Sequence, residues 1–190
     1  ETDLGIPALT AKDLADLAVM APLVDMVGLS FVRAPADVLA LHEQMQFLGA
    51  AHLGTVLKIE TRQGFENLPM ILLASLRHPP VGVMVARGDL AVEVGFERLA
   101  EVQEEILWLC EAAHIPVIWA TQVLENMAKR GIPSRAEVSD AALAVRAECV
   151  MLNKGPYVVD TVQLLNGVLE RMSGHQVKRR QISRRLAVSQ

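Results

Sequence analysis

Short apolar runs alternate with amphipathic stretches along most of this chain. An apolar run rich in β-branched residues predicts a buried parallel strand, and apolar positions three or four residues apart predict a helix that covers the sheet. The predicted strands cover residues 24–32, 52–60, 81–86, 116–120 and 149–152. The predicted helices cover residues 35–48, 63–77, 96–114, 122–129, 136–146 and 159–172. Strands and helices in this order favour right-handed βαβ units and a parallel sheet.

Two parallel architectures fit that order, an open sheet and a closed barrel. No glycine-rich dinucleotide-binding sequence follows the first strand, which argues against a Rossmann sheet. Charged residues stand at the ends of several successive strands, as they do at the mouth of a barrel. A complete TIM barrel has eight strands and about 250 residues. The predicted fold class is therefore α/β, a partial TIM (β/α)8 barrel of about five parallel βα units.

Charged residues stand at the carboxyl ends of two neighbouring predicted strands. Lys58 and Glu60 lie two residues apart on a strand, so their side chains share one face. Asp89 follows the next strand, directly after Gly88. A cation beside two carboxylates suits a divalent metal such as Mg²⁺ or Mn²⁺ together with an anionic substrate. Two structural roles stay open at this point, a salt bridge between Lys58 and Glu60 and a helix cap at Asp89.

A hydroxyl and an arginine complete the candidate residues. Thr121 ends the fourth strand, where its hydroxyl could bind a substrate carboxylate, relay a proton or cap the following helix. Arg135 lies in Ser134-Arg135-Ala136-Glu137, a pattern that predicts the start of a helix and favours a structural or interface role for the arginine.

Composition narrows the class of protein. The chain has 190 residues, 52% of them hydrophobic and 21% charged, with a net charge of -4, which predicts a folded globular domain without a nucleic-acid partner. No apolar run approaches the roughly 20 residues that span a membrane. Cys110 and Cys149 lack motif spacing, which predicts reduced core cysteines in a cytoplasmic protein. Glu1 stands in place of an initiator Met, so we expect a piece of a longer protein.

The last residues differ from the rest in charge. We expect a barrel-like domain over residues 1–174 and a basic C-terminal tail over residues 175–190. The tail carries Lys178, Arg179, Arg180, Arg184 and Arg185. Such a run is typical of a solvated terminal helix, and the alternative is a docking segment for a partner subunit.

Several segments together resemble the barrel domain of pyruvate kinase. The resemblance covers about residues 4–172 and keeps the family's order along the chain. The segments that carry it are residues 6–13 (IPALTAKD), 25–33 (DMVGLSFVR), 57–60 (LKIE), 84–90 (MVARGDL), 118–125 (IWATQVLE) and 133–137 (PSRAE). By analogy, the predicted strands correspond to barrel strands four to eight.

The resemblance implies a role for each candidate residue. Lys58 would stabilise the phosphoryl group in transfer, and Glu60 and Asp89 would bind Mg²⁺ or Mn²⁺. The backbone of Gly88 and Asp89, with the hydroxyl of Thr121, would hold the carboxylate of phosphoenolpyruvate. Thr121 would also lie near the face where the enolate is protonated, so Lys58 and Thr121 would be the catalytic residues.

The resemblance also implies the reaction, a glycolytic phosphotransfer from phosphoenolpyruvate to ADP that yields pyruvate and ATP. This chain would hold the metal and enolpyruvate half of the site and would be inactive alone. K⁺ can serve the parent protein, with ligands outside this chain. Arg135 would support the Gly88–Asp89 segment of a neighbouring subunit, which predicts a homo-oligomer.

One segment departs from the family pattern. Residues 153–157 (NKGPY) stand where the family carries Ser-Gly-Glu-Thr. Two other functions stay open, a non-catalytic relative that binds phosphoenolpyruvate or pyruvate, and a Mg²⁺-dependent aldolase or lyase that acts through a pyruvate enolate.

Overall fold

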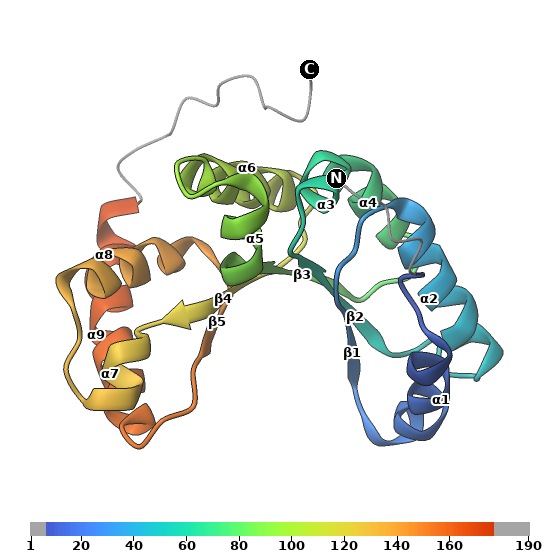
Figure 1. The fold of residues 1–190 in the computed structure, drawn as a ribbon, viewed down its shortest axis with the longest axis horizontal. Coiled ribbons are helices and arrows are strands. Elements are labelled where there is room, and N and C mark those ends of the chain that lie inside the picture. The colour runs from blue at the N-terminus through green and yellow to red at the C-terminus, as the bar shows by residue number, and fades with distance from the viewer. Residues whose placement is uncertain (1–6, 177–190) are drawn as a thin grey trace.

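A single parallel sheet organises the computed structural model, which describes residues 7–176. Its five strands follow one another in sequence order across the sheet. They are β1 (Met26–Leu29), β2 (Gly54–Ile59), β3 (Val81–Ala86), β4 (Val117–Val123) and β5 (Cys149–Leu152). The sheet curves into an arch in Figure 1. These parallel strands, with helices between them, confirm the predicted α/β class. They also agree with the prediction of a partial barrel of about five βα units.

Helices connect successive strands, and the longer ones lie along the convex side of the arch (Figure 1). Their bounds are α1 (Ala11–Met20), η1 (Ala21–Leu23), α2 (Pro35–Phe47), α3 (Arg62–Glu66), α4 (Leu68–Ser75), α5 (Arg87–Val94), α6 (Leu99–Ala112), α7 (Glu125–Arg130), α8 (Arg135–Leu143), η2 (Ala144–Arg146) and α9 (Val158–Gln176). Helix α1 precedes the first strand and was not among the predicted helices. It begins with a capping box between Thr10 and Asp13.

Proline explains one difference from the predicted helices. The single helix expected over residues 63–77 is two helices, α3 and α4, which meet at Asn67. Pro69 follows closely, and a proline restricts the preceding residue and cannot donate the hydrogen bond that would continue the first helix. The side chain of Asn67 instead donates from Nδ2 to the carbonyl of Arg33 at 2.8 Å.

The structure corrects two further boundaries. Strand β4 continues past residue 120 to Val123, so the predicted helix over residues 122–129 begins only at Glu125. Helix α6 begins at Leu99, three residues later than predicted, and leaves Phe96 in a turn with 76% of its surface exposed. An aromatic residue that fits helical spacing can therefore lie outside the helix and outside the core.

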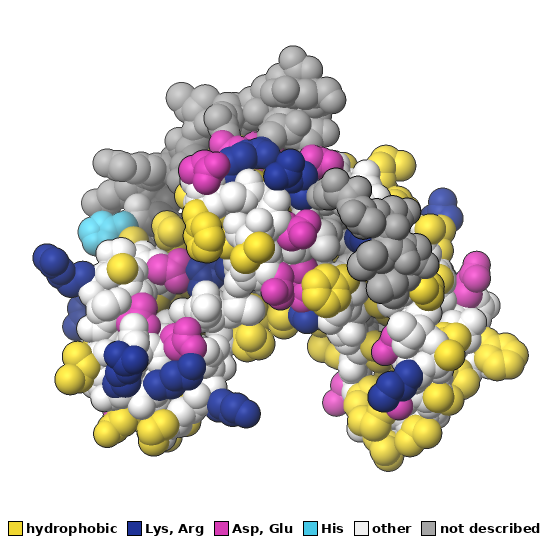
Figure 2. Space-filling model, in the orientation of Figure 1, with side chains coloured by type: hydrophobic (Ala, Val, Ile, Leu, Met, Phe, Trp, Pro, Cys, Tyr) yellow, Lys and Arg dark blue, Asp and Glu magenta, His cyan; other side chains and the backbone are white. Residues whose placement is uncertain are grey.

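The two faces of the sheet differ in burial. Leu57, Ile59, Val83 and Val85 point towards the helices and are fully buried. On the opposite face Met26 is 62% exposed, and this face lines the hollow of the arch in Figure 2.

The prediction that both cysteines lie in the core is right for only one of them, because the two faces of the sheet differ in burial. Cys110, on α6, is buried, as predicted. Cys149 lies opposite Ile118 in β4 and is exposed, so the prediction of a core position is wrong for it. An apolar strand sequence predicted burial on both faces, whereas helices cover only one face of this sheet.

The basic part of the tail, from residue 177 onward, lies outside the described residues. The division into a domain over residues 1–174 and a tail therefore stays a prediction. Among the described residues, no helix combines the length and the apolar character that crossing a membrane requires.

Candidate active site at the carboxyl end of the sheet

Lys58 and Glu60 form an ion pair at the end of β2. The Lys58 Nζ lies 2.6 Å from Glu60 Oε1, and the glutamate side chain is only 2% exposed. The lysine side chain is 30% exposed. The salt bridge that the sequence left open is therefore present, and the lysine side chain stays partly exposed within it.

Two further hydrogen bonds tie this pair to the end of β1. Lys58 Nζ donates to Ser30 Oγ at 2.8 Å, and the backbone N–H of Phe31 donates to Glu60 Oε2 at 2.9 Å. Phe31 has a φ of 52°, in the left-handed region that a non-glycine residue rarely adopts. The buried carboxylate thus has a donor on each oxygen and holds an unusual turn in place.

The Gly88 backbone meets the Thr121 side chain at the next two strand ends. The N–H of Gly88 donates to Thr121 Oγ1 at 2.8 Å. Gly88 lies in the first turn of α5, where backbone N–H groups have no partner within the helix and can bind an anion. Thr121 does not cap the next helix, because Leu124 is the N-cap residue of α7. The capping role that the sequence left open is therefore wrong.

Asp89 is exposed in the first turn of α5, and its side chain has no hydrogen bond or ion pair among the described residues. The residue that precedes this helix, Ala86, has no side chain that could cap it. Asp89 is therefore not the cap of α5. Its carboxylate faces solvent and is available to a ligand.

Sequence reasoning missed Arg87, which is the most connected side chain of the site. It is 7% exposed. Its Nε donates to the carbonyl of Ala120 at 2.9 Å, and one terminal nitrogen donates to the carbonyl of Thr121 at 2.7 Å. The other terminal nitrogen pairs with Asp140 of α8. An arginine at the end of an apolar strand was the only sequence signal for this role.

The guanidinium of Arg87 also lies over the ring of Trp119, 4.8 Å from the ring centroid. Thr121 and Gln122, the residues that Arg87 holds in place, have φ values of 61° and 57°. Arg87 therefore stabilises an unfavourable backbone conformation at the end of β4, which sets the direction of the Thr121 hydroxyl.

A cavity of about 440 Å³ adjoins this part of the site. Gly88, Thr121 and Asp140 line it, together with the exposed side chains of Val92 and Phe96. The sequence placed Gly88 and Thr121 at one site, and the structure brings them into direct contact.

The carboxylates of Glu60 and Asp89 are the metal ligands that the sequence predicts. Ile59 is opposite Val85 in the sheet register, so Glu60 and Asp89 follow adjacent strand ends. Among residues 7–176 there is no group of three or more His, Cys, Asp or Glu side chains that could hold a metal ion. Two carboxylates that leave the other coordination positions to water and substrate oxygens still suit Mg²⁺ or Mn²⁺.

Comparison with known proteins identifies the family. The model described as pyruvate kinase, barrel domain, matches residues 1–162. The chain belongs to the pyruvate kinase family.

Three similar relatives illustrate the match. The pyruvate kinase of Bacillus licheniformis is 38% identical over 175 residues, which are 88% of this chain and 29% of the relative. That of Kluyveromyces lactis is 40% identical over 171 residues, 86% of this chain and 33% of the relative. That of Mycobacterium intracellulare is 38% identical over 174 residues, 88% of this chain and 36% of the relative. The chain spans about a third of the length of these pyruvate kinases.

Arg135 is the first residue of α8 and is exposed. The helix start that the sequence predicted here is confirmed by a capping box, in which Ser134 and Glu137 bond each other's backbone N–H groups. Arg135 is not among the described residues that contact Arg87. Its role at a subunit interface in a pyruvate kinase oligomer stays a prediction.

The segment that departs from the pyruvate kinase pattern is packed against α7. Tyr157 donates its backbone N–H to the carbonyl of Ala128 at 3.1 Å. A Cβ atom at Gly155 would lie 2.1 Å from that same carbonyl oxygen, so only glycine fits there. Residues 153–157 therefore form a tightly packed connection between β5 and α9.

Proposed function

We propose that the protein containing this chain is a pyruvate kinase, which transfers the phosphoryl group of phosphoenolpyruvate to ADP and produces pyruvate and ATP. The chain supplies the metal and enolpyruvate half of the active site and is inactive alone. The observation that carries the proposal is the juxtaposition of the Lys58–Glu60 pair with the Gly88–Thr121 contact at the carboxyl end of the sheet. This is the end where barrels of this kind carry their active sites.

Lys58 has the chemistry to stabilise the transferred phosphoryl group. Its ammonium is held by Glu60 and Ser30, and its side chain stays 30% exposed. Phosphoryl transfer depends on positioning and charge neutralisation more than on covalent chemistry, and a fixed cation supplies both. The ion pair with Glu60 keeps the ammonium in place before the substrate arrives.

Glu60 and Asp89 fit a Mg²⁺ or Mn²⁺ ion. An ionised carboxylate offers about four lone-pair sites, and the bonds to Lys58 and Phe31 occupy only part of those on Glu60. The carboxylate of Asp89 is exposed and has no partner among the described residues. The bound metal would supply positive charge next to the oxygens of the substrate. We assign any K⁺ requirement to residues outside this chain.

The N–H of Gly88 is the proposed anchor for the substrate carboxylate. In the structure that N–H donates to the Thr121 hydroxyl. A carboxylate that takes over the N–H of Gly88, with that of Asp89 beside it, would free the hydroxyl to donate its own proton to the ligand. Thr121 would then lie beside the enolate, where a proton must be delivered to form pyruvate.

A homo-oligomer in the cytoplasm completes the proposal. The cavity beside Gly88 has exposed apolar walls at Val92 and Phe96, and Arg135 is exposed on α8. These features support a subunit contact near the site. The isolated chain should also self-associate in sedimentation velocity runs, because β1 and β5 are sheet edges and one face of the sheet is uncovered. A stable monomer would contradict this part of the proposal.

The test is a coupled lactate dehydrogenase assay on the full-length protein, with phosphoenolpyruvate, ADP and Mg²⁺. We expect activity in the unmodified protein and a loss of at least about 10³-fold in kcat in Lys58→Met, since a fixed charge at the transferred group is removed. Lys129→Met is the matched control, because Lys129 pairs with Glu125 on the surface of α7, away from the candidate site. Binding of phosphoenolpyruvate without turnover in the unmodified protein would instead indicate the non-catalytic relative. Metal-dependent cleavage or formation of a carbon–carbon bond next to pyruvate would indicate the aldolase or lyase.

A further inference from the structure

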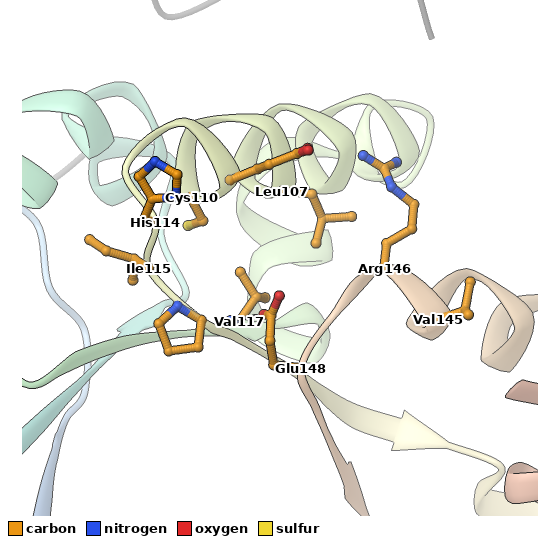
Figure 3. Close-up of a pocket in the computed structure, with 10 residues that line it drawn as sticks. Leu107, Cys110, His114, Ile115, Val117, Val145, Arg146 and Glu148 are labelled. Carbon is orange, nitrogen blue, oxygen red and sulfur yellow. Dashed lines mark hydrogen bonds between the residues drawn. The ribbon is translucent and has the colours of Figure 1, made fainter. Parts of the chain in front are cut away.

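A second cavity lies at the opposite end of the sheet from the candidate active site. It has a volume of about 500 Å³ and lies between α6, η2 and the beginnings of β4 and β5 (Figure 3). We call it the amino-end pocket. Its apolar lining includes Leu107, Cys110, Ile115 and Val117, all of which are buried. These side chains form a small apolar floor for one apolar side chain of a bound segment, and polar residues such as Glu111, His114 and Glu148 supply most of the accessible lining.

The rim of the amino-end pocket is acidic. Glu111 and Glu148 line it, both are exposed, and neither has an ion pair among the described residues. Glu148 accepts only a backbone hydrogen bond, from the N–H of Val117 at 2.6 Å. Arg146 also lines the pocket, but Glu104 of α6 neutralises its charge. The whole of α6 carries four glutamates and no lysine or arginine. The carboxylates of Glu111 and Glu148 at the rim therefore favour a cationic partner.

Helix α9 runs towards this end of the sheet, and a cationic segment follows it in the sequence. Helix α9 follows β5 and runs back towards the end where the strands begin, as the helix of a βα unit does. It contacts η2, which contributes Arg146 to the pocket. Figure 1 shows the red end of α9 beside α8. Residues 177–190 continue from there, and these 14 residues can reach up to about 46 Å if extended.

The composition of residues 177–190 matches the pocket. The segment has five basic residues and no acidic one. Its apolar residues include Ile182 and Leu186, which stand between and after the two basic clusters. We propose that residues 177–190 dock in the amino-end pocket of the same chain, with an apolar side chain in the cavity and basic side chains at Glu111 and Glu148. This contact is independent of the proposed phosphotransfer, because it lies at the other end of the sheet.

Zero-length carbodiimide coupling of the complete 190-residue chain, read by mass spectrometry, tests the contact. Lys178 is the only lysine in residues 177–190, so its couplings report where the segment lies. We expect Lys178 to couple to Glu111 and Glu148 and not to Glu43 or Glu66, which are also exposed but lie on other helices. The double variant Arg179→Gln, Arg180→Gln should lower the coupling yield about fivefold, the effect of losing two exposed ion pairs.

Two controls keep the test decisive. Glu111→Gln should remove the Lys178–Glu111 product and leave the Lys178–Glu148 product, whereas Glu43→Gln should change neither. In a mixture of ¹⁴N- and ¹⁵N-labelled chains, the products should join segments of the same label. Coupling to Glu43 and Glu66 as readily as to the pocket would overturn the proposal. Products that join the two labels would overturn it as well, because the segment would then bind a second copy.

Discussion

The two ends of the sheet have similar elements but differ in how their polar groups are used. At the carboxyl end, Lys58 and Arg87 are held in networks that span neighbouring strands, while the Lys58 side chain is partly exposed and that of Asp89 is exposed. At the amino end, the polar groups are rim charges and the buried His42, whose ring packs beside that of the exposed His78. Barrels of this kind carry their active sites at the carboxyl end and use the other end for stability, and the site proposed for this chain lies at the carboxyl end.

Backbone strain follows the same division. Four of the five non-glycine residues with positive φ among the described residues are near the carboxyl end, and only His114 is at the amino end. The four are Phe31, Thr121, Gln122 and Leu124. Residues persist in such conformations only when their surroundings hold them there. The hydrogen bonds from Phe31 to Glu60 and from Arg87 to Thr121 are those surroundings.

Two buried side chains at the amino end, those of His42 and Cys110, favour their neutral forms. His42 is 4% exposed, and its ring lies 4.6 Å from that of His78, measured between centroids. Burial, followed by the charge of His78, lowers the pKa of His42. Burial, followed by the carboxylate of Glu148, raises the pKa of Cys110 to about 12. Both groups are therefore neutral near pH 7, whereas the carboxyl end depends on charged groups.

The largest effect in this comparison is expected from Arg87→Met in the full-length protein. Losing the bonds to two carbonyls and to Asp140 should let the Thr121 backbone relax and lower kcat/KM for phosphoenolpyruvate by about 10²-fold, the scale of a misplaced active-site group. KM for ADP should change little. Arg98→Met is the control, since the side chain of Arg98 pairs with Glu101 at the surface and makes no other ion pair within residues 7–176. Equal losses in both variants would show that Arg87 has no positioning role.

A smaller effect is expected when the pH is lowered. It acts through His42 at the amino end and changes the free energy of unfolding rather than the activity. The pKa of His42 is lower in the folded chain than its ordinary value of 6.5, so the unfolded chain binds the proton first as the pH falls. The contribution of His42 to the free energy of unfolding is therefore fully present above about pH 6.5, and it declines as the pH falls below that value. Urea unfolding at pH 7.5 and 5.5 should give a smaller difference for His42→Gln than for the unmodified chain. An unchanged difference would contradict the role of His42.

The smallest effect is expected for the two cysteines. Iodoacetamide at pH 8 should modify the exposed Cys149 and leave Cys110 unmodified until the chain unfolds, because the buried thiol stays protonated. Cys149→Ser should change the free energy of unfolding by less than about 0.5 kcal/mol. Rapid modification of Cys110 in the folded chain, measured by peptide mass spectrometry, would show that the amino end is open.

The sequence predicted most of the fold because local pattern determined it. Five apolar runs became five parallel strands, and the pattern around Ser134 became a capped helix. Lys58 and Glu60 were predictable as a pair, since a strand brings alternate residues to one face. The resemblance to pyruvate kinase placed Gly88 and Thr121 at one site, and the structure joins them by a hydrogen bond.

Other features depend on tertiary context. The buried position of Arg87 depends on carbonyls 33 and 34 residues away, which no local pattern reveals. The exposure of Cys149 depends on which face of the sheet the helices cover. Phe96 has an apolar side chain at helical spacing, yet the helix begins after it. Local sequence constrains strands and caps more strongly than it constrains contacts between distant segments.

The most direct test of the central claim is a Mn²⁺ titration of the full-length protein in the presence of oxalate, a mimic of the pyruvate enolate, followed by water-proton relaxation. We predict that Glu60→Gln and Asp89→Asn each weaken Mn²⁺ binding by at least about tenfold, because each removes a charged oxygen ligand. Glu111→Gln, at the amino-end pocket, should leave it unchanged. Undiminished Mn²⁺ binding in both carboxyl-end variants would contradict the assignment of the metal and enolpyruvate site to this end of the sheet.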